Sequence, residues 1–178
     1  KQHIEITRDL AIKFNQTFAA DVLVPPEPYI VAEVAVVPGL DGQKMSKSYD
    51  NTIEIFQTDK QTKKRCGRIV TDSTPMENPK NPDTCNVFAL LKLLADQAEL
   101  DEIAAAYRAG GYGYGQAKNR LAELINALFA GPREKYAAYE NDPDTVRDIL
   151  REGGRRARQV AEATMARVRD AAGIVTTY

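Results

Sequence analysis

Two lysines three residues apart stand in the polar stretch Gln43-Lys44-Met45-Ser46-Lys47-Ser48-Tyr49-Asp50-Asn51. Just upstream, Asp41-Gly42 favours a tight turn, because glycine enters positive-φ conformations without steric cost. Two ammonium groups and two serine hydroxyls on a mobile loop suit a polyanion whose charge grows during reaction, such as the phosphates of ATP. The glycine pair of a Walker loop is absent. The spacing alone also fits a solvated charge run.

Composition narrows the classes of function. The chain has 178 residues with 24 basic and 25 acidic side chains, so its net charge of −1 predicts no general affinity for nucleic acid. Two cysteines and one histidine cannot build a four-ligand zinc site, and no metal site is predicted. The cysteines are expected to be reduced and structural in a cytoplasmic protein. No apolar run approaches the length of a membrane span.

The elements upstream of the lysines are expected to position them. Apolar spacing predicts a helix over 2–18, and the prolines of 25–28 then force extended backbone. The β-branched stretch 30–37 predicts a strand, the last of a parallel sheet, with the lysine loop leaving its carboxyl end. Open α/β sheets bind ligands at that end, so Val36 and Val37 become candidates to offer backbone groups to an adenine.

Downstream of Asn51 the pattern is helical. Apolar stripes predict helices from Val87 to Leu94, from Leu100 to Tyr107, from Ala117 to Leu128 with a kink or an end at Pro132, and from Val146 to Val168. Without strands of their own, these helices should form a bundle. The glycine-rich stretch 110–115 between two of them is better explained as a turn with packed tyrosines than as a phosphate loop. The fold class is therefore mostly α, with the edge of an α/β domain at its start.

A further helix over 59–70 carries a dense basic patch in an otherwise balanced chain. The patch is either a solvated helix face or an RNA contact, and the solvated face is at least as well supported as the RNA contact. We call these residues the basic patch: Lys60, Lys63, Lys64, Arg65 and Arg68.

The literal string KMSKS at 44–48 matches the second signature of the class I aminoacyl-tRNA synthetases. In that family the loop closes over ATP, and its lysines stabilise the triphosphate as pyrophosphate leaves. The resemblance therefore implies that Lys44 and Lys47 are catalytic and bind ATP, which carries Mg²⁺, with Met45, Ser46 and Ser48 as further ATP contacts.

Other segments resemble the tryptophanyl-tRNA synthetases in particular. They are KQHIEITRDLAIKFN at the start, TDS at 71–73, NPDTCNVFALLKL and GGYGYGQAK. The first follows the loop that closes the amino-acid and ATP pocket in the family, so His3 is expected near the ATP site.

The resemblance also divides the chain. Residues 1–51 would be the C-terminal part of the Rossmann-type catalytic domain, and residues 52–178 the α-helical domain that meets the anticodon arm. The family's first, HIGH-like signature is absent, so the chain resembles the C-terminal half of the enzyme and is predicted to be inactive alone. The expected partners are tryptophan, tRNA(Trp) and a second copy of the enzyme, without a membrane.

Three alternatives stay open at this point. A tyrosyl-tRNA synthetase has the same architecture, although TDS and GYGYG argue against it. A non-catalytic RNA-binding helical module would bind tRNA without any effect of ATP, and a helical domain used only for interactions would bind neither.

Overall fold

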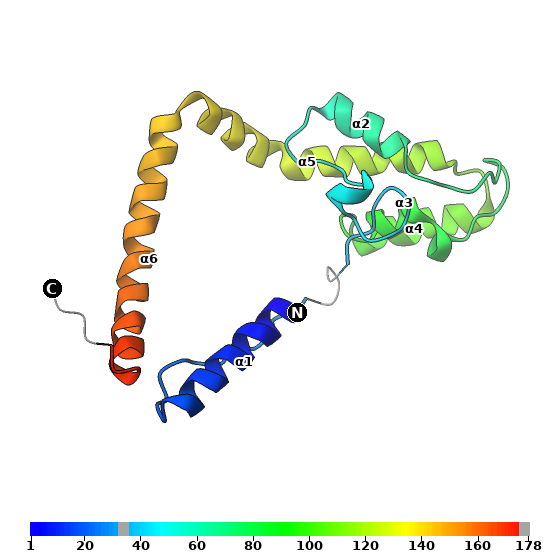
Figure 1. Cartoon of the computed structure of the whole chain (residues 1–178). Coiled ribbons are helices and arrows are strands. Elements are labelled where there is room, and N and C mark those ends of the chain that lie inside the picture. Colours follow the sequence, from blue (N-terminus) through cyan, green and yellow to red (C-terminus); the bar gives the residue numbers. More distant parts are fainter. Residues whose placement is uncertain (32–35, 175–178) are drawn as a thin grey trace. The chain divides into compact units, whose positions relative to one another are not determined.

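The computed structural model describes residues 1–31 and 36–174, and these are mostly helical (Figure 1). The chain divides into two compact units, one formed by 1–31 with 141–178 and the other by 32–140. Each is described by itself below. The predicted division into a catalytic part, 1–51, and a helical domain, 52–178, concerns function and stays a prediction.

The first unit contains α1 (Gln2–Thr17) and α6 (Pro143–Ala171). After α1 the chain folds back along it, because the Asn15 side chain donates to the Leu23 carbonyl at 2.7 Å and accepts from the Leu23 amide at 3.0 Å. An ion pair between Arg8 and Glu27 fixes the returning segment further along. The predicted first helix is thus confirmed, one residue shorter at its end.

α6 is amphipathic but has no buried residue. Its outer face carries ion pairs between neighbouring turns, such as Arg151–Asp148 at 2.6 Å and Arg155–Glu152 at 2.8 Å. Its apolar side chains are largely exposed, among them Ile149, Leu150 and Val160.

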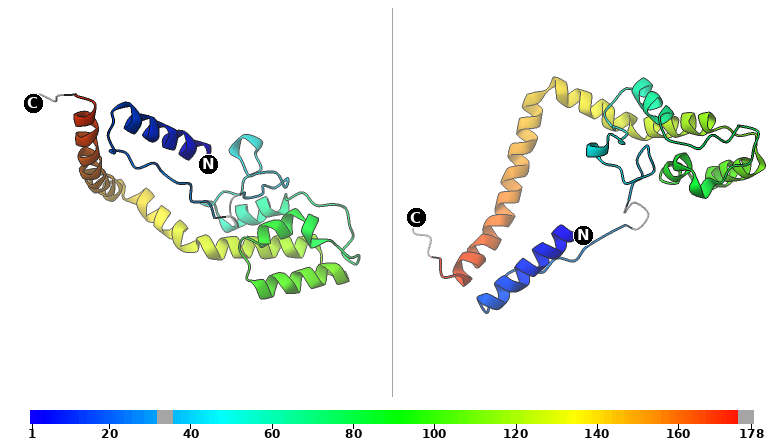
Figure 2. Two further views of the ribbon diagram at one scale, coloured as in Figure 1. Left: turned by 90° about the horizontal axis from the view of Figure 1, so that it is seen from below. Right: turned by 45° about the vertical axis from the view of Figure 1, so that its right-hand side comes forward.

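The second unit holds the hydrophobic core. It consists of α2 (Asp59–Gly67), α3 (Asn86–Leu91), α4 (Gln97–Ala109) and most of α5 (Tyr114–Asn141), with two short 3₁₀ helices, η2 (Lys47–Tyr49) and η3 (Pro82–Thr84). Figure 2 shows α2 beside the first half of α5, where Lys118 donates to the Gly67 carbonyl at 3.2 Å. Most of the core comes from the predicted stripes, namely Val87, Leu90, Leu91, Leu100, Ile103, Ala104, Tyr107, Ala117, Leu121 and Ile125. Cys66, Ile69 and Phe88 belong to the core without having been predicted there, and Leu128, predicted to lie on a stripe, is 55% exposed.

The glycine-rich stretch is a turn with packed tyrosines, as predicted. Gly110 ends α4 at φ +82, and a Cβ there would lie 2.3 Å from the Glu77 carbonyl oxygen, so only glycine fits. The rings of Tyr112 and Tyr114 pack on the fully buried Tyr107, with centroids 5.7 and 5.8 Å away. The segment therefore closes the core and is not a phosphate loop.

Three expectations differ from the structure. Half of the predicted strand, 32–35, lies outside the described residues, and the flanking Ile30, Val31, Val36 and Val37 are not in a strand. The helix predicted to reach Val70 ends at Gly67, because the Val70 amide donates to the Leu40 carbonyl at 2.7 Å instead. Of the kink or end predicted at Pro132, the end is ruled out, because α5 continues through this residue.

Candidate functional site

The lysine stretch begins with a tight turn. Pro38 and Lys44 form an isolated antiparallel bridge, and the Met45 amide donates to the Val37 carbonyl at 2.8 Å. Gly42 lies at φ +81, as the Asp41-Gly42 pair predicts. The KMSKS loop thus returns along the segment that leads into it.

Within the KMSKS loop the two serines shape the backbone. Ser46 caps η2, since its Oγ accepts from the Ser48 amide at 3.3 Å and lies 2.8 Å from the Ser48 Oγ. Asp50 closes the short helix in the left-handed conformation at φ 48, with its amide donating to the Lys47 carbonyl at 3.3 Å. These contacts give the loop a defined backbone conformation.

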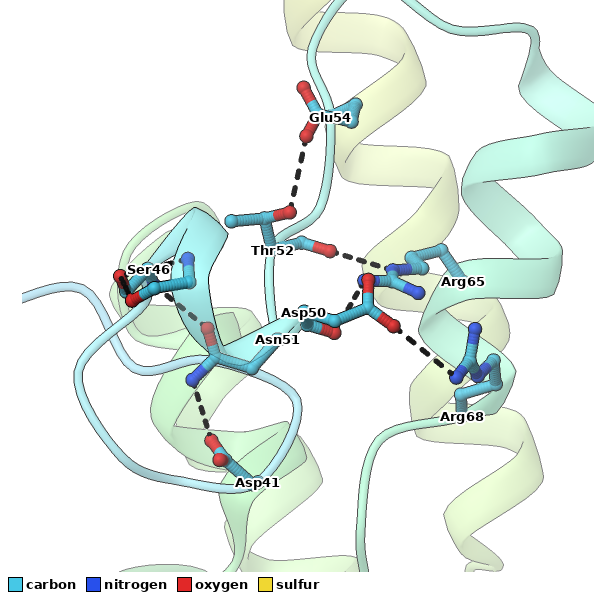
Figure 3. A network of polar contacts seen from close by, with 9 residues as sticks. Asp41, Ser46, Asp50, Asn51, Thr52, Glu54, Arg65 and Arg68 are labelled. Atoms are coloured by element: carbon cyan, nitrogen blue, oxygen red, sulfur yellow. Dashed lines mark hydrogen bonds and ion pairs between the residues drawn. The ribbon is translucent and has the colours of Figure 1, made fainter.

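Asn51 holds this shape from inside the loop (Figure 3). Only 3% of it is exposed, and its side chain contacts three parts of the turn. The amide oxygen accepts from the Ser46 amide at 2.7 Å, while the amide nitrogen donates to the Lys44 carbonyl at 3.2 Å and to Asp41 Oδ1 at 2.8 Å. The last bond also lowers the pKa of the Asp41 carboxyl. A Cβ at Gly39 would lie 2.3 Å from the Asn51 Nδ2, so glycine is required there.

The two lysines of the loop are exposed. Among the residues that the structure describes, neither the Lys44 nor the Lys47 ammonium has an ion-pair or hydrogen-bond partner. Exposed ammonium groups on an ordered backbone are what the predicted phosphate contacts would need, and those contacts stay a prediction.

Met45, placed by the sequence among the ATP contacts, lines an open apolar pocket of about 500 Å³. Its neighbours there are Val37 from the incoming chain, Ile53 from the outgoing chain, and side chains of α3 and α5 such as Leu90 and Leu121. The thioether thus contributes to the apolar face beneath the KMSKS loop.

The remaining two candidates for ATP contacts lie elsewhere in the chain. Val36 is 58% exposed at a bend just before the turn. His3 is exposed in α1, in the other compact unit, where its carbonyl accepts from Thr7 Oγ1 at 2.8 Å. Their contacts with a nucleotide stay predictions.

The basic patch falls into two groups. Lys60, Lys63 and Lys64 are exposed and, in the described part of the chain, have no ion-pair partner. Arg65 instead turns toward the KMSKS loop and is only 16% exposed. Its Nε donates to the Thr52 carbonyl at 2.7 Å, and its Nη2 donates to the Asp50 carbonyl at 2.6 Å and to Asp50 Oδ1 at 2.7 Å. Arg68 adds a longer ion pair to Asp50 at 3.9 Å.

Sequence reasoning missed the residues that hold this site together. Arg133 of α5 donates to the Ile55 carbonyl at 2.7 Å and to Thr62 Oγ1 at 3.1 Å, and pairs with Asp59 at 2.8 Å. It therefore fixes the segment after the KMSKS loop and the start of α2. These bonds join residues more than 70 positions apart, so no local pattern could have indicated them.

A second missed residue organises the proline-rich segment that follows TDS. Lys80 is 4% exposed and donates to the carbonyls of Pro75, Met76 and Asn78 at 2.8–2.9 Å. Nearby, the Tyr114 hydroxyl donates to Asp72 Oδ1 at 2.8 Å. Burial and this bond raise the pKa of Tyr114 to about 12.

Both cysteines are free and buried. Burial raises the pKa of the Cys66 thiol to about 11, which suits the predicted structural role. In the described ranges no cluster of three or more His, Cys, Asp or Glu side chains could hold a metal ion, and no helix is long and apolar enough to cross a membrane.

Comparison with known proteins shows the family to which the chain belongs. The family model of class I tRNA synthetases (W and Y) matches residues 1–130. Tryptophan–tRNA ligases of Rhodopirellula baltica and Fusobacterium nucleatum are 49% and 45% identical over 97% and 98% of this chain. In both cases the match covers 54% of the relative, so the chain spans about half the length of these curated relatives.

A solved structure shows that the similarity extends to the fold. The tryptophanyl-tRNA synthetase of Campylobacter jejuni, crystallised with ADP and tryptophan, superimposes with a TM-score of 0.82 at 44% identity. The match covers 97% of this chain and 54% of that protein. The fold, the KMSKS loop and these relatives agree: the chain belongs to the class I tRNA synthetases of the tryptophan and tyrosine group, and within it to the tryptophanyl enzymes.

Proposed function

We propose that this chain serves in tryptophan–tRNA ligation, as the part of the ligase that carries the KMSKS loop. The proposed reaction joins tryptophan and ATP into tryptophanyl-adenylate with release of pyrophosphate, and then transfers the aminoacyl group to tRNA(Trp). The observation that carries the proposal is the loop itself: Ser46 and Asn51 fix its backbone, while Lys44 and Lys47 stay exposed and unpaired among the described residues.

The proposed chemistry follows from that arrangement. Negative charge grows on the phosphate oxygens as the bond between the α- and β-phosphates breaks, and fixed ammonium groups stabilise such charge most when they need no reorganisation. We assign this role to Lys44 and Lys47. Mg²⁺ is proposed to accompany the nucleotide and to neutralise part of its charge, and no general base is required of this chain.

The remaining assignments are proposals of the same kind. His3 and the backbone at Val36 would contact the nucleotide, with Met45, Ser46 and Ser48 supporting the loop. Residues 1–51 would complete the catalytic domain and 52–178 would form the helical domain that meets the anticodon arm of tRNA. The active protein would be a cytoplasmic homodimer.

The test uses a complete ligase, by which we mean this chain joined to the remaining length that its curated relatives have. Tryptophan-dependent exchange of pyrophosphate into ATP should be clear, and tyrosine should support little exchange. Exchange with tyrosine in place of tryptophan would indicate the tyrosyl enzyme. tRNA binding without exchange for either amino acid would indicate a non-catalytic RNA-binding module, and binding of neither tRNA nor ATP an interaction domain.

A further inference from the structure

The backbone conformation of Asp50 is uncommon, although Asp and Asn adopt it more readily than other residues that carry a Cβ. Asp50 is one of two non-glycine residues at positive φ in the described chain, and such backbone is unfavourable for a side chain with a Cβ. Asp50 is also the residue that ends η2, the short helix containing Lys47. The direction in which Lys47 is presented therefore depends on whatever keeps Asp50 in this conformation.

Arg65 makes the contacts that can do so (Figure 3). Its guanidinium donates hydrogen bonds to the carbonyl and the carboxylate of Asp50 and, through Nε, to the carbonyl of Thr52. These three acceptors lie on both sides of Asn51, so one planar group fixes the chain as it leaves the loop. A planar guanidinium donates in several fixed directions at once, which a lysine ammonium on a flexible stem does not reproduce.

The two neighbouring residues face opposite ways. Asn51 bonds inward to the turn, whereas Asp50 bonds outward to α2. α2 in turn is well anchored, since Thr62 and Cys66 are fully buried and a Thr58–Gln61 capping box starts the helix. Together these bonds connect the loop to a fixed helix. The pKa of the Asp50 carboxyl is held low by its hydrogen bond with Arg65, so the carboxylate is ionised at neutral pH.

We propose that the contacts between Arg65 and Asp50, which we call the clasp, position the KMSKS loop. Arg65 is then a positioning residue for adenylate formation and not a tRNA contact. The inference rests on the proposed function for its catalytic part, but the clasp itself is a property of this chain. It also separates Arg65 from Lys60, Lys63 and Lys64, with which sequence reasoning had grouped it.

The first test follows amide hydrogen exchange of residues 44–51 in this chain. In Arg65→Ala we expect exchange in this segment to become faster by about 10-fold, as loss of a charged hydrogen bond implies. Arg65→Lys should behave similarly, because lysine keeps the positive charge but lacks the several fixed donors of the guanidinium. This second variant keeps the test valid if the alanine variant fails to fold. Arg68→Ala is the matched control, since its ion pair to Asp50 is longer and more exposed, and it should leave the segment unchanged.

The second test measures pyrophosphate exchange in the complete ligase. Arg65→Ala should lower kcat by about 10- to 100-fold with little change in KM for tryptophan, because a displaced loop misplaces catalytic groups without touching the amino acid. Asp50→Asn combined with Arg65→Ala should be less harmful than the product of the single effects, as expected for residues in contact.

The outcomes are distinct. Unchanged hydrogen exchange at 44–51 in both Arg65 variants would overturn the clasp, and so would equal effects of Arg65→Ala and Arg68→Ala. If hydrogen exchange responds as expected but the unmutated complete ligase shows no activity with tryptophan, the clasp stands and the proposed function falls.

Discussion

Asn51 is the residue on which the shape of the KMSKS loop depends most directly. Its side chain satisfies two backbone groups of the loop, the Ser46 amide and the Lys44 carbonyl, in a place that water does not reach. Buried polar groups that lose their partner pay the full cost of desolvation, which exceeds the net gain of an ordinary hydrogen bond. The exposed lysines next to it contribute nothing comparable to folding.

We therefore expect Asn51→Ala to lower the free energy of unfolding of this chain by about 1–3 kcal/mol. Thermal or urea unfolding followed by circular dichroism gives the value. Asn119→Ala, at an exposed position in α5, is the control and should change stability little. Equal stability of the two variants would mean that Asn51 does not hold the turn.

At the scale of elements, α2 has two faces with different tasks. One face packs into the core and carries Arg65 to the KMSKS loop, and the other presents Lys60, Lys63 and Lys64 to solvent. Phosphate contacts release counterions, so each one steepens the salt dependence of nucleic-acid binding by roughly 0.7–0.9 in log–log slope. Such contacts position RNA without reading its bases.

For the complete ligase, Lys63→Glu combined with Lys64→Glu should weaken tRNA binding and flatten its salt dependence while leaving adenylate formation intact. The measurement is tRNA affinity across a salt series. Arg151→Glu combined with Arg155→Glu on α6 is the control with the same change in charge, and its arginines already pair with Asp148 and Glu152. If the salt slope changes only in the α6 variant, then α6 and not α2 contacts the tRNA.

At the scale of the whole molecule, local patterns predicted the helices well. Apolar spacing identified α1 and the core-facing sides of α3, α4 and α5, because a helix that packs on a core buries one apolar stripe. The stripe predicted for α6 also lies on a helix, but α6 has no buried residue. The KMSKS loop was found by its literal sequence. The bonds of Asn51, Arg65 and Arg133 were not predictable, since each joins segments that only the folded chain brings together. The end of α2 was missed for the same reason, since Leu40 captures the amide of Val70.

The chain spans about half the length of its curated relatives and lacks a HIGH-like signature. We expect it to form no adenylate by itself, because in the proposed reaction the KMSKS lysines would act on a triphosphate that other residues must hold in line. Pyrophosphate exchange by the purified chain should stay at background with tryptophan, while the complete ligase is active under the same conditions. Clear exchange by the purified chain would show that it contains a full active site.

In the proposed function, the KMSKS loop stabilises charge that grows as pyrophosphate leaves. The most direct measurement is single-turnover adenylate formation by the complete ligase with Lys47→Ala, beside tryptophan affinity measured on the same protein. We predict a rate about 10²–10³ times lower, as for loss of one preorganised donor, with nearly unchanged tryptophan affinity. An unchanged rate of adenylate formation would contradict the account and make the loop a solvated charge run.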